Sequence, residues 1–215
     1  CGLQMPDRFI DILEQTGLIM DAGDWVLREA CAAVRHLPLS LAVNVSPRQF
    51  QHPRLGERLM RILDEIGFPA DRLELEITEQ IVVEDEEGAI ATLHDLASRG
   101  IRIALDDYGT GFSSLQRLKR LPLHTLKIDK DFVMSLETSR ADAAIVRSTI
   151  ELCHQLDIHV VAEGVENDAA MAMLRSFGCD IGQGYGICRP LPLARLTDWL
   201  GTATVSALAG RRPGG

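Results

Sequence analysis

The sequence lacks the common signatures of disulfide, zinc and membrane proteins. Its five cysteines form no CxxC pair, its six histidines form no HExxH motif, and no secretory signal is visible. No apolar run approaches the roughly 18 residues needed to cross a bilayer. We therefore expect a reducing, cytoplasmic location. Any membrane anchor would come from segments outside these 215 residues.

Positive charge is also scarce. The chain has 22 Lys+Arg against 31 Asp+Glu, a net charge of −9 and a pI near 5.1. This balance argues against a nucleic-acid polymer as partner, because binding a phosphate backbone needs a basic surface. A small phosphate ester held through metal ions stays possible, since the ions supply the positive charge.

What is present is a globular composition with 46% hydrophobic residues, enough for a core. Short β-rich segments alternate with amphipathic helical stretches, which predicts an α/β fold with a parallel sheet in one domain. Apolar residues spaced along 55–66 predict a helix that Gly67 ends. Asn167 is expected to cap a second helix that ends at Gly178, and Asp24 to cap a third. The expected strands are Leu41–Ser46, Leu73–Thr78, Ile101–Asp106, Thr125–Asp129, His159–Glu163 and Asp180–Tyr185.

Each expected strand carries a polar residue near its C-terminal end. Alternate residues of a strand face opposite sides, and in five of the six segments the apolar residues occupy the other parity. In a closed barrel such positions meet at one mouth, where active sites of this architecture lie. The alternative is that these groups form buried ion pairs or point to solvent. The residues are Asn44, Glu76, Asp106, Lys127, Glu163 and Gln183.

These residue types favour a hard cation. Glu76, Asp106, Asp107 and Glu163 offer carboxylate oxygens, and such donors suit Mg²⁺ or Mn²⁺ better than Zn²⁺. Converging carboxylates repel one another unless cations neutralise them, and the adjacent pair Asp106-Asp107 suits two bridged ions. Lys127 would orient a water or stabilise a phosphorane. The pattern predicts metal-assisted phosphodiester hydrolysis.

A glycine-rich loop follows the third expected strand. The segment DDYGTGFSSL, residues 106–115, places two glycines and small hydroxyls after the aspartate pair. Its plain interpretation is a strand-to-helix turn with Ser113 as the helix cap. Next to two aspartates at an inward strand end, it also suits a mobile loop at a site.

Taken together, the motifs resemble the EAL-domain family, the cyclic di-GMP phosphodiesterases of bacterial signalling. The resemblance runs over roughly residues 5–200 and keeps the family's order and spacing. It implies a TIM-like barrel that converts cyclic di-GMP to linear pGpG with two divalent cations. The matching motifs are NVS at 44–46, ELEITE at 74–79, DDYGTGFSSL at 106–115, LKIDKDFV at 126–133, AEGVE at 162–166, GCD at 178–180, QGY at 183–185 and RPLP at 189–192.

The resemblance also implies roles for individual residues. Asn44, Glu76 and Asp106 would bind one cation, and Asp106, Asp107 and Glu163 the other. Lys127 would hold the attacking water, with Glu163 as an alternative base and Gln183 supporting water and substrate. Glu79 would anchor the 107–114 loop and couple it to a homodimer. Asp129 and Glu166 would support the metal ligands from behind.

Two features of the family are missing from the chain. The Glu-Ala-Leu motif and a nearby substrate-binding arginine are absent, and GLQMP at 2–6 resembles the stretch that follows them. We therefore expect an EAL domain over 1–205, incomplete at its N-terminus and lacking its first strand, and a flexible tail over 206–215. Upstream sensory or GGDEF domains are expected partners. A non-catalytic cyclic di-GMP receptor or protein-interaction module is the alternative function.

Overall fold

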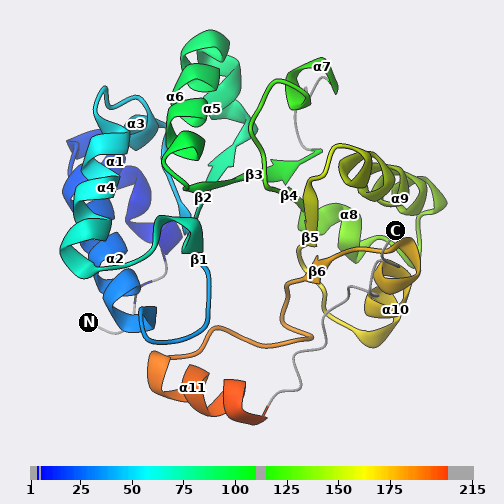
Figure 1. Ribbon diagram of the computed structural model, residues 1–215. Helices are drawn as coiled ribbons and strands as arrows, with labels where there is room; N and C mark the ends of the chain where they lie inside the picture. The colour runs from blue at the N-terminus through cyan, green and yellow to red at the C-terminus, as the bar shows by residue number, and fades with distance from the viewer. Residues whose placement is uncertain (1–3, 5, 110–114, 203–215) are drawn as a thin grey trace, which may run out of the picture. The chain divides into compact units, whose positions relative to one another are not determined.

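The computed structural model describes residues 4, 6–109 and 115–202 (Figure 1). The chain divides into two compact units. The first unit comprises residues 1–104 and 120–122, and the second comprises 105–119 and 123–215. The boundary falls inside strand β3, Arg102–Tyr108, so this strand contributes to both units.

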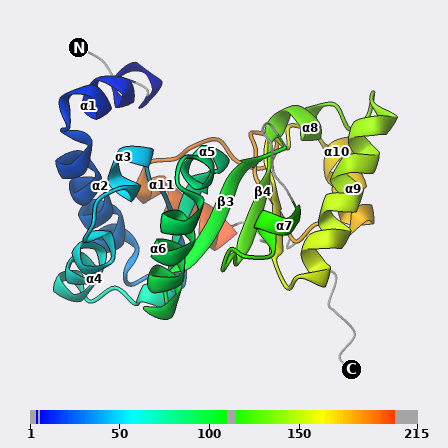
Figure 2. The same cartoon turned by 90° about the horizontal axis from the view of Figure 1, so that it is seen from above.

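The first unit has an α/β core with hydrogen-bonded strands in the order β1-β2-β3. β1 and β2 are parallel, in a register that runs from Leu41 opposite Leu73 to Asn44 opposite Glu76. Helices α4 and α6 touch each other, and α4 also packs on α2 (Figure 2). The elements are η1 Pro6–Arg8, α1 Ile10–Thr16, α2 Ile19–Val34, β1 Leu41–Asn44, α3 Pro47–Phe50, α4 Leu55–Ile66, η2 Ala70–Arg72, β2 Leu73–Thr78, α5 Glu79–Glu84 and α6 Glu86–Ser98.

The core of this unit follows from the apolar stripes of its helices. Leu59, Ile62 and Leu63 of α4 are buried, as the spacing predicts. Gly67 ends the helix with φ 71°, a left-handed conformation that favours glycine. On the strand side, the alternate residues Leu73, Leu75 and Ile77 of β2 have almost no exposed surface.

Arg72 ties the end of α2 to the chain that leads into β1. Its guanidinium donates hydrogen bonds to four carbonyl oxygens, including Val34 (3.1 Å), Arg35 (3.0 Å) and Leu39 (2.8 Å), with Leu37 as the fourth. It also lies over the Phe68 ring at 4.8 Å from the centroid. The last carbonyls of a helix have no partner within it, so this one side chain satisfies groups that would otherwise need water.

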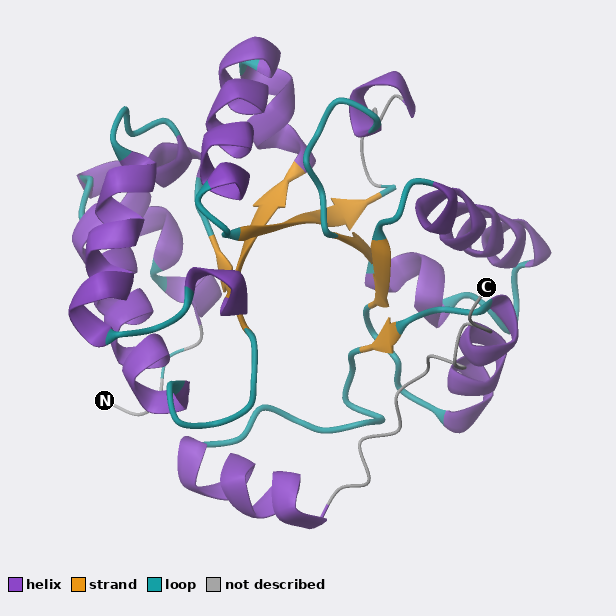
Figure 3. Cartoon of the chain, viewed as in Figure 1, coloured by secondary structure: helices purple, strands orange, loops and turns teal. Residues whose placement is uncertain are grey.

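The second unit has strands in the order β3-β4-β5-β6, in which β4 pairs with β5 and β5 with β6 in parallel (Figure 3). Val146, Ile150 and Cys153 of α9 are buried, and α9 packs against β5. The elements are α7 Leu115–Leu118, β4 Thr125–Ile128, α8 Lys130–Met134, α9 Arg140–Gln155, β5 His159–Ala162, α10 Asp168–Phe177, β6 Ile181–Gly182 and α11 Leu193–Thr202.

All six expected strands are present, and four of them are shorter than the sequence predicts. β4 and β5 each end one residue early, β1 and β6 lose more, and β3 begins and ends later than predicted. β1 ends at Asn44 because Ser46 turns the chain into α3, where its side chain and Gln49 form a reciprocal capping box. β6 is only two residues long, because Gln183 already bonds to the loop after β5. Asn167 and Gly178 cap α10 at its two ends, as expected.

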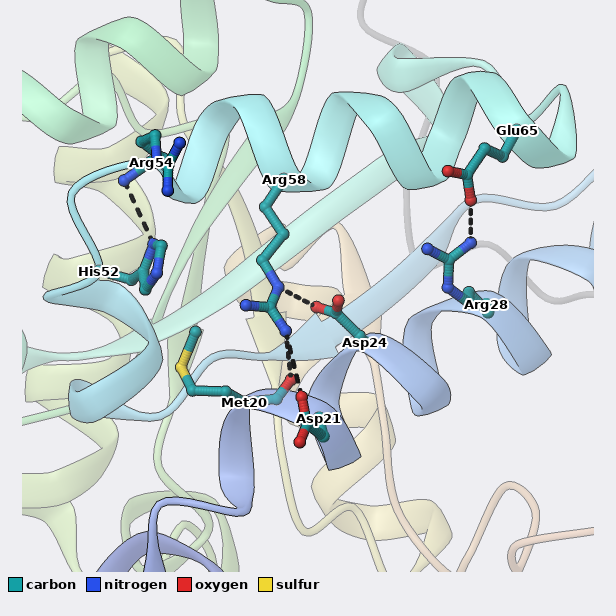
Figure 4. A network of polar contacts seen from close by, with 8 residues as sticks. All are labelled: Met20, Asp21, Asp24, Arg28, His52, Arg54, Arg58 and Glu65. Atoms are coloured by element: carbon teal, nitrogen blue, oxygen red, sulfur yellow. Dashed lines mark hydrogen bonds and ion pairs between the residues drawn. The ribbon is translucent and has the colours of Figure 1, made fainter.

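The expectation that Asp24 caps a helix is wrong. α2 begins at Ile19, so Asp24 lies inside it, and its carboxylate accepts a hydrogen bond from Arg58 Nε on α4 at 2.7 Å (Figure 4). The same guanidinium lies 3.6 Å from Asp21. Asp24 therefore forms an ion pair between α2 and α4 and does not cap a helix. Ser113, predicted as a cap, and the tail over 206–215 lie outside the described residues.

No helix within the described part of the chain is both long enough and apolar enough to cross a membrane.

Candidate active site

A buried ion-pair cluster lies where β3, β4 and β5 of the second unit end. Lys127 Nζ is 3.0 Å from Asp106 Oδ1 and 2.7 Å from Glu163 Oε1. Lys127 is 4% exposed and Asp106 is 8% exposed. The three residues come from consecutive strands: Asp106 and Lys127 lie near the C-terminal ends of β3 and β4, and Glu163 directly follows β5. The strand pattern predicts this proximity.

Asp107 adds a third carboxylate in a strained conformation. Its φ is 54°, in the left-handed region that non-glycine residues rarely adopt, although Asp and Asn tolerate it best. Its backbone N–H donates to Asp106 Oδ1 at 3.0 Å. Burial raises the pKa of the Asp107 carboxyl, and the charges of Asp106 and Asp129 raise it further. Such strain is characteristic of functional sites.

Glu163 also has a raised pKa. Burial is the main cause, the hydrogen bond and charge of Lys127 oppose it, and the charges of Asp106 and Asp107 add to it. A carboxyl that holds its proton more tightly than usual is a better general base when it is ionised. Glu163 therefore has the environment of a residue that accepts a proton.

The donor set of this cluster suits a divalent cation. Ligand oxygens of Asp106, Asp107 and Glu163 all lie within 4.8 Å of one another, and this is the only such group in the part of the chain that the structure describes. Three carboxylates against the single charge of Lys127 leave a net negative charge, which a cation would neutralise. Carboxylate oxygens are the ligands that Mg²⁺ and Mn²⁺ prefer.

A cavity of about 860 Å³ opens beside the cluster, within the second unit. Its lining includes Glu163 and Gln183, and Met134 and Trp199 contribute apolar surface. Arg189 lies over the Tyr185 ring, 4.7 Å from the centroid, at the same cavity. This volume is within the usual range for sites that enclose a small-molecule ligand.

The first unit holds the other two predicted metal ligands side by side. Asn44 Nδ2 donates to Glu76 Oε2 at 3.0 Å, across the β1–β2 register pair. This bond uses the amide nitrogen, so the carbonyl Oδ1 of Asn44, the atom that a cation would bind, is not consumed by it. Glu79, the predicted loop anchor, is the first residue of α5 in the same unit. Residues 110–114 of its expected partner loop lie outside the described residues.

The two remaining predicted residues lie in the second unit. Asp129 is buried and caps α8, where its side chain accepts from Asp131 N at 2.8 Å, and its charge acts on Asp107. Glu166 is exposed and lines the cavity with Glu163 and Gln183.

Sequence reasoning missed one polar cluster, around Asp180. Its Oδ2 accepts a hydrogen bond from Val160 N at 2.8 Å and lies 2.9 Å from His154 Nε2. The GCD motif contained Asp180, and the spacing of His154 gave no sign of a partner, because the contact joins α9 to the start of β6. Cys153 and Cys179 are buried free thiols.

Comparison with known proteins identifies the family. Residues 2–190 match the EAL domain. The chain belongs to the EAL domain family. It has the TIM-like α/β barrel fold of that family, as the strand pattern and the resemblance predicted.

The relatives of this EAL domain are longer signalling proteins. A signaling protein of Caulobacter vibrioides is 44% identical over 97% of this chain and 26% of that protein. The cyclic di-GMP phosphodiesterase NbdA of Pseudomonas aeruginosa is 40% identical over 93% of this chain and 26% of that protein. The chain thus spans about a quarter of the length of the curated relatives that it matches.

Solved EAL structures share the fold. The structure titled PaMucR phosphodiesterase, c-di-GMP complex, has a TM-score of 0.86 and 39% identity, covering 91% of this chain and 81% of that chain. A calcium and cyclic di-GMP complex of Klebsiella pneumoniae BlrP1 has a TM-score of 0.71 and 33% identity, covering 78% of this chain and 44% of that chain.

Proposed function

We propose that this EAL domain hydrolyses one phosphodiester bond of cyclic di-GMP, giving linear pGpG, with Mg²⁺ or Mn²⁺ as cofactor. The observation that carries the proposal is the cluster of Asp106, Asp107, Glu163 and Lys127, in which Asp106 and Lys127 are buried and Glu163 lines an 860 Å³ cavity. Relatives that are 35–40% identical are named cyclic di-GMP phosphodiesterases, which supports the same substrate here.

The residues proposed to hold the cations are all oxygen donors. In the second unit they are Asp106, Asp107 and Glu163, and in the first unit Asn44 and Glu76 offer a further amide and carboxylate. A bound divalent cation would act as a Lewis acid on phosphoryl oxygen and lower the pKa of bound water. The resemblance to the family suggests two ions, with Asp106 shared between them.

The chain's own residues supply positioning and proton transfer. Lys127 is held by two carboxylates, so its ammonium points at a defined place where it would orient the attacking water. Glu163, with its raised pKa, would take the proton of that water. Gln183 lies at the cavity on the other loop and would hydrogen-bond to the water or the substrate.

The test is release of pGpG from cyclic di-GMP, followed by chromatography with the full-length protein and saturating Mg²⁺ or Mn²⁺. Asp106→Asn is expected to lose more activity than Asp107→Asn, because Asp106 is proposed to contact both ions. Asp157→Asn serves as the control, since Asp157 is exposed and also has a positive φ. Near-normal turnover by Asp106→Asn would contradict the metal assignment.

Binding measured in parallel separates catalysis from simple recognition. If the wild-type protein binds cyclic di-GMP with either cation but releases no pGpG, the catalytic proposal is wrong and the chain is a receptor. We expect turnover that disappears with EDTA and returns when the cation is restored.

A further inference from the structure

The loops that follow β5 and β6 touch each other backbone to backbone within the second unit. Val165 N–H donates to Gln183 O at 3.0 Å, and Gly186 N–H donates to Val165 O at 2.9 Å. We refer to residues 165–166 and 184–186, joined by these bonds, as the loop clasp. Its residues Glu166, Gly184 and Tyr185 also line the cavity beside Glu163.

Two glycines of the loop clasp allow this approach. A Cβ atom on Gly184 would lie 2.2 Å from Val165 O and 2.3 Å from Val165 N. A Cβ on Gly186 would lie 2.5 Å from the Glu166 carbonyl carbon. The obstacle is backbone in both cases, so no side-chain rotation relieves it. Neither glycine has a positive φ, so space rather than conformational freedom requires glycine here.

The loop clasp immediately follows two residues of the proposed site. Glu163 N–H donates to Ile128 O at 3.1 Å, and Gln183 N–H donates to Ala162 O at 2.8 Å, so the backbones of both residues are fixed to neighbouring strands. Beyond these bonds, each chain segment is held by the clasp, and Val165 is only 1% exposed. Val165 is two residues from Glu163, so we expect a shift of Val165 to strain the Glu163–Ile128 bond and to move the Glu163 carboxylate relative to Lys127 and Asp106.

We propose that Gly184 and Gly186 are positioning residues. The two glycines let the loops after β5 and β6 pack closely against each other. This packing holds the Glu163 carboxylate 2.7 Å from Lys127 Nζ and close to Asp106 and Asp107, the other carboxylates that would bind the cation. The kinetic part of this inference rests on the proposed function, whereas the loop contact and its effect on cation binding do not.

The expected effects are large because the geometry has little tolerance. Ordinary van der Waals contact of a Cβ begins at 3.4 Å, so an alanine at residue 184 forces a local shift of about 1 Å. A displacement of this size lowers turnover by about 10²-fold at well-ordered active sites. Loss of the groups that orient a metal ligand weakens metal binding by about 10- to 100-fold.

The experiment compares Gly184→Ala and Gly186→Ala with Gly201→Ala in the full-length protein. Gly201 is a matched control, because a Cβ added there would meet nothing within 4 Å and the residue belongs to the same unit. Four quantities are measured: the Mn²⁺ dissociation constant by EPR titration, kcat and KM for cyclic di-GMP, and the thermal midpoint. We expect the first two variants to bind Mn²⁺ about 10-fold more weakly, with a fall in kcat larger than the change in KM.

A merely structural role would lower the thermal midpoint and leave Mn²⁺ affinity unchanged at temperatures where the variants are folded. Wild-type Mn²⁺ affinity and kcat in both variants would overturn the proposal. If the wild-type protein binds Mn²⁺ but does not turn over, the phosphodiesterase proposal fails while the Mn²⁺ comparison still judges the loop clasp.

A measurement on the wild-type protein covers the case in which both variants fail to fold. If the clasp and the cation cluster are coupled, the coupling is reciprocal, so saturating Mg²⁺ is expected to slow hydrogen exchange of the Val165 and Gly186 amides. Unchanged exchange at these two amides, with Mg²⁺ bound, would contradict the inference.

Discussion

At the scale of single residues, Lys127 supplies the positive charge that lies against two carboxylates of the site. Its ammonium is buried and lies between Asp106 and Glu163, so each of these carboxylates depends on it when no divalent cation is bound. Removing one member of a buried ion pair leaves an uncompensated charge, which destabilises a protein far more than loss of an exposed pair.

We expect Lys127→Met to abolish pGpG release and to lower the metal-free free energy of unfolding by about 3 kcal/mol. Urea unfolding at neutral pH, with EDTA, measures the change in stability. Lys119→Met is the control, because Lys119 is exposed. Equal stability of the two variants would show that Lys127 does not compensate these carboxylates.

The raised pKa of Asp107 gives a pH dependence of known sign. Between its unfolded and folded pKa values, the native state binds more protons than the unfolded state, so this residue lowers stability as pH rises above about 4. Without metal, we expect the stability of Asp107→Asn relative to wild type to increase as pH rises above about 4. We also expect added Mg²⁺ to stabilise this variant less than it stabilises wild type. Thermal melts from pH 4 to 8 test this.

The control for that series is Asp157→Asn, which makes the same change at an exposed residue with φ 58°. A stability difference between Asp107→Asn and wild type that does not change with pH would contradict the assignment.

How well the sequence predicts individual residues depends on how local their contacts are. Asp106, Lys127 and Glu163 come together because strand alternation and parallel order suffice to place them. The contact of Asp180 with His154 joins segments that no period relates, so it could not be predicted from spacing. The prediction for Asp24 was wrong because an acidic residue before an apolar stripe resembles a helix cap whether or not the helix has already begun. Here α2 begins five residues earlier, at Ile19.

At the scale of elements, boundaries depend on tertiary contacts more than on the strand or helix pattern. α4 and α10 end at the predicted glycines because a left-handed residue terminates a helix locally. β6 ends early because Gln183, the residue after it, bonds to Val165 in the loop that follows β5. No local sequence pattern indicates this contact. The C-terminal end of α2 also depends on a distant contact. The carbonyl of its last residue, Val34, accepts a hydrogen bond from Arg72, which lies 38 residues further along the chain.

We expect Arg72→Lys to lower the free energy of unfolding by about 2 kcal/mol, because a lysine lacks the planar fork that bonds to several carbonyls at once, and these carbonyls would lose donors. The change should appear in urea titrations of the protein without cations. Arg61→Lys, at an exposed residue of α4, is the matched control and should stay near wild type. Identical midpoints for both variants would show that water replaces the guanidinium.

At the scale of the whole molecule, three buried cysteines report on the two compact units separately. Cys31 belongs to the first unit, and Cys153 and Cys179 belong to the second. Burial raises the pKa of Cys31 to about 11 and that of Cys153 and Cys179 to about 12. Because the thiolate is the reactive form, native alkylation of all three should be slower by at least about 100-fold than in unfolded chain.

Pulsed iodoacetamide labelling along a urea gradient, read by peptide mass spectrometry, tests this. We expect no label on Cys31, Cys153 or Cys179 in the native protein, and label on each only as its own unit unfolds. The half-buried Cys188 is the internal control for reagent access. Rapid native labelling of Cys153 or Cys179 would contradict the burial of α9 against its strand.

The fold class was predictable at this scale because alternating β and α segments allow few arrangements, and the family comparison agrees. The boundary between the two compact units could not be predicted in the same way. It falls within β3, and no change in composition marks residue 104.

The carboxylate cluster also has a kinetic consequence. A protein with a net charge of −9 that gathers Asp106, Asp107 and Glu163 around one lysine repels an approaching phosphate ester. Encounter between the cation-free protein and an anionic ligand should therefore accelerate as ionic strength rises, the opposite of electrostatic steering. A divalent cation that binds first neutralises the local negative charge. The order in which cation and ligand bind, rather than affinity alone, therefore sets how quickly the complex forms.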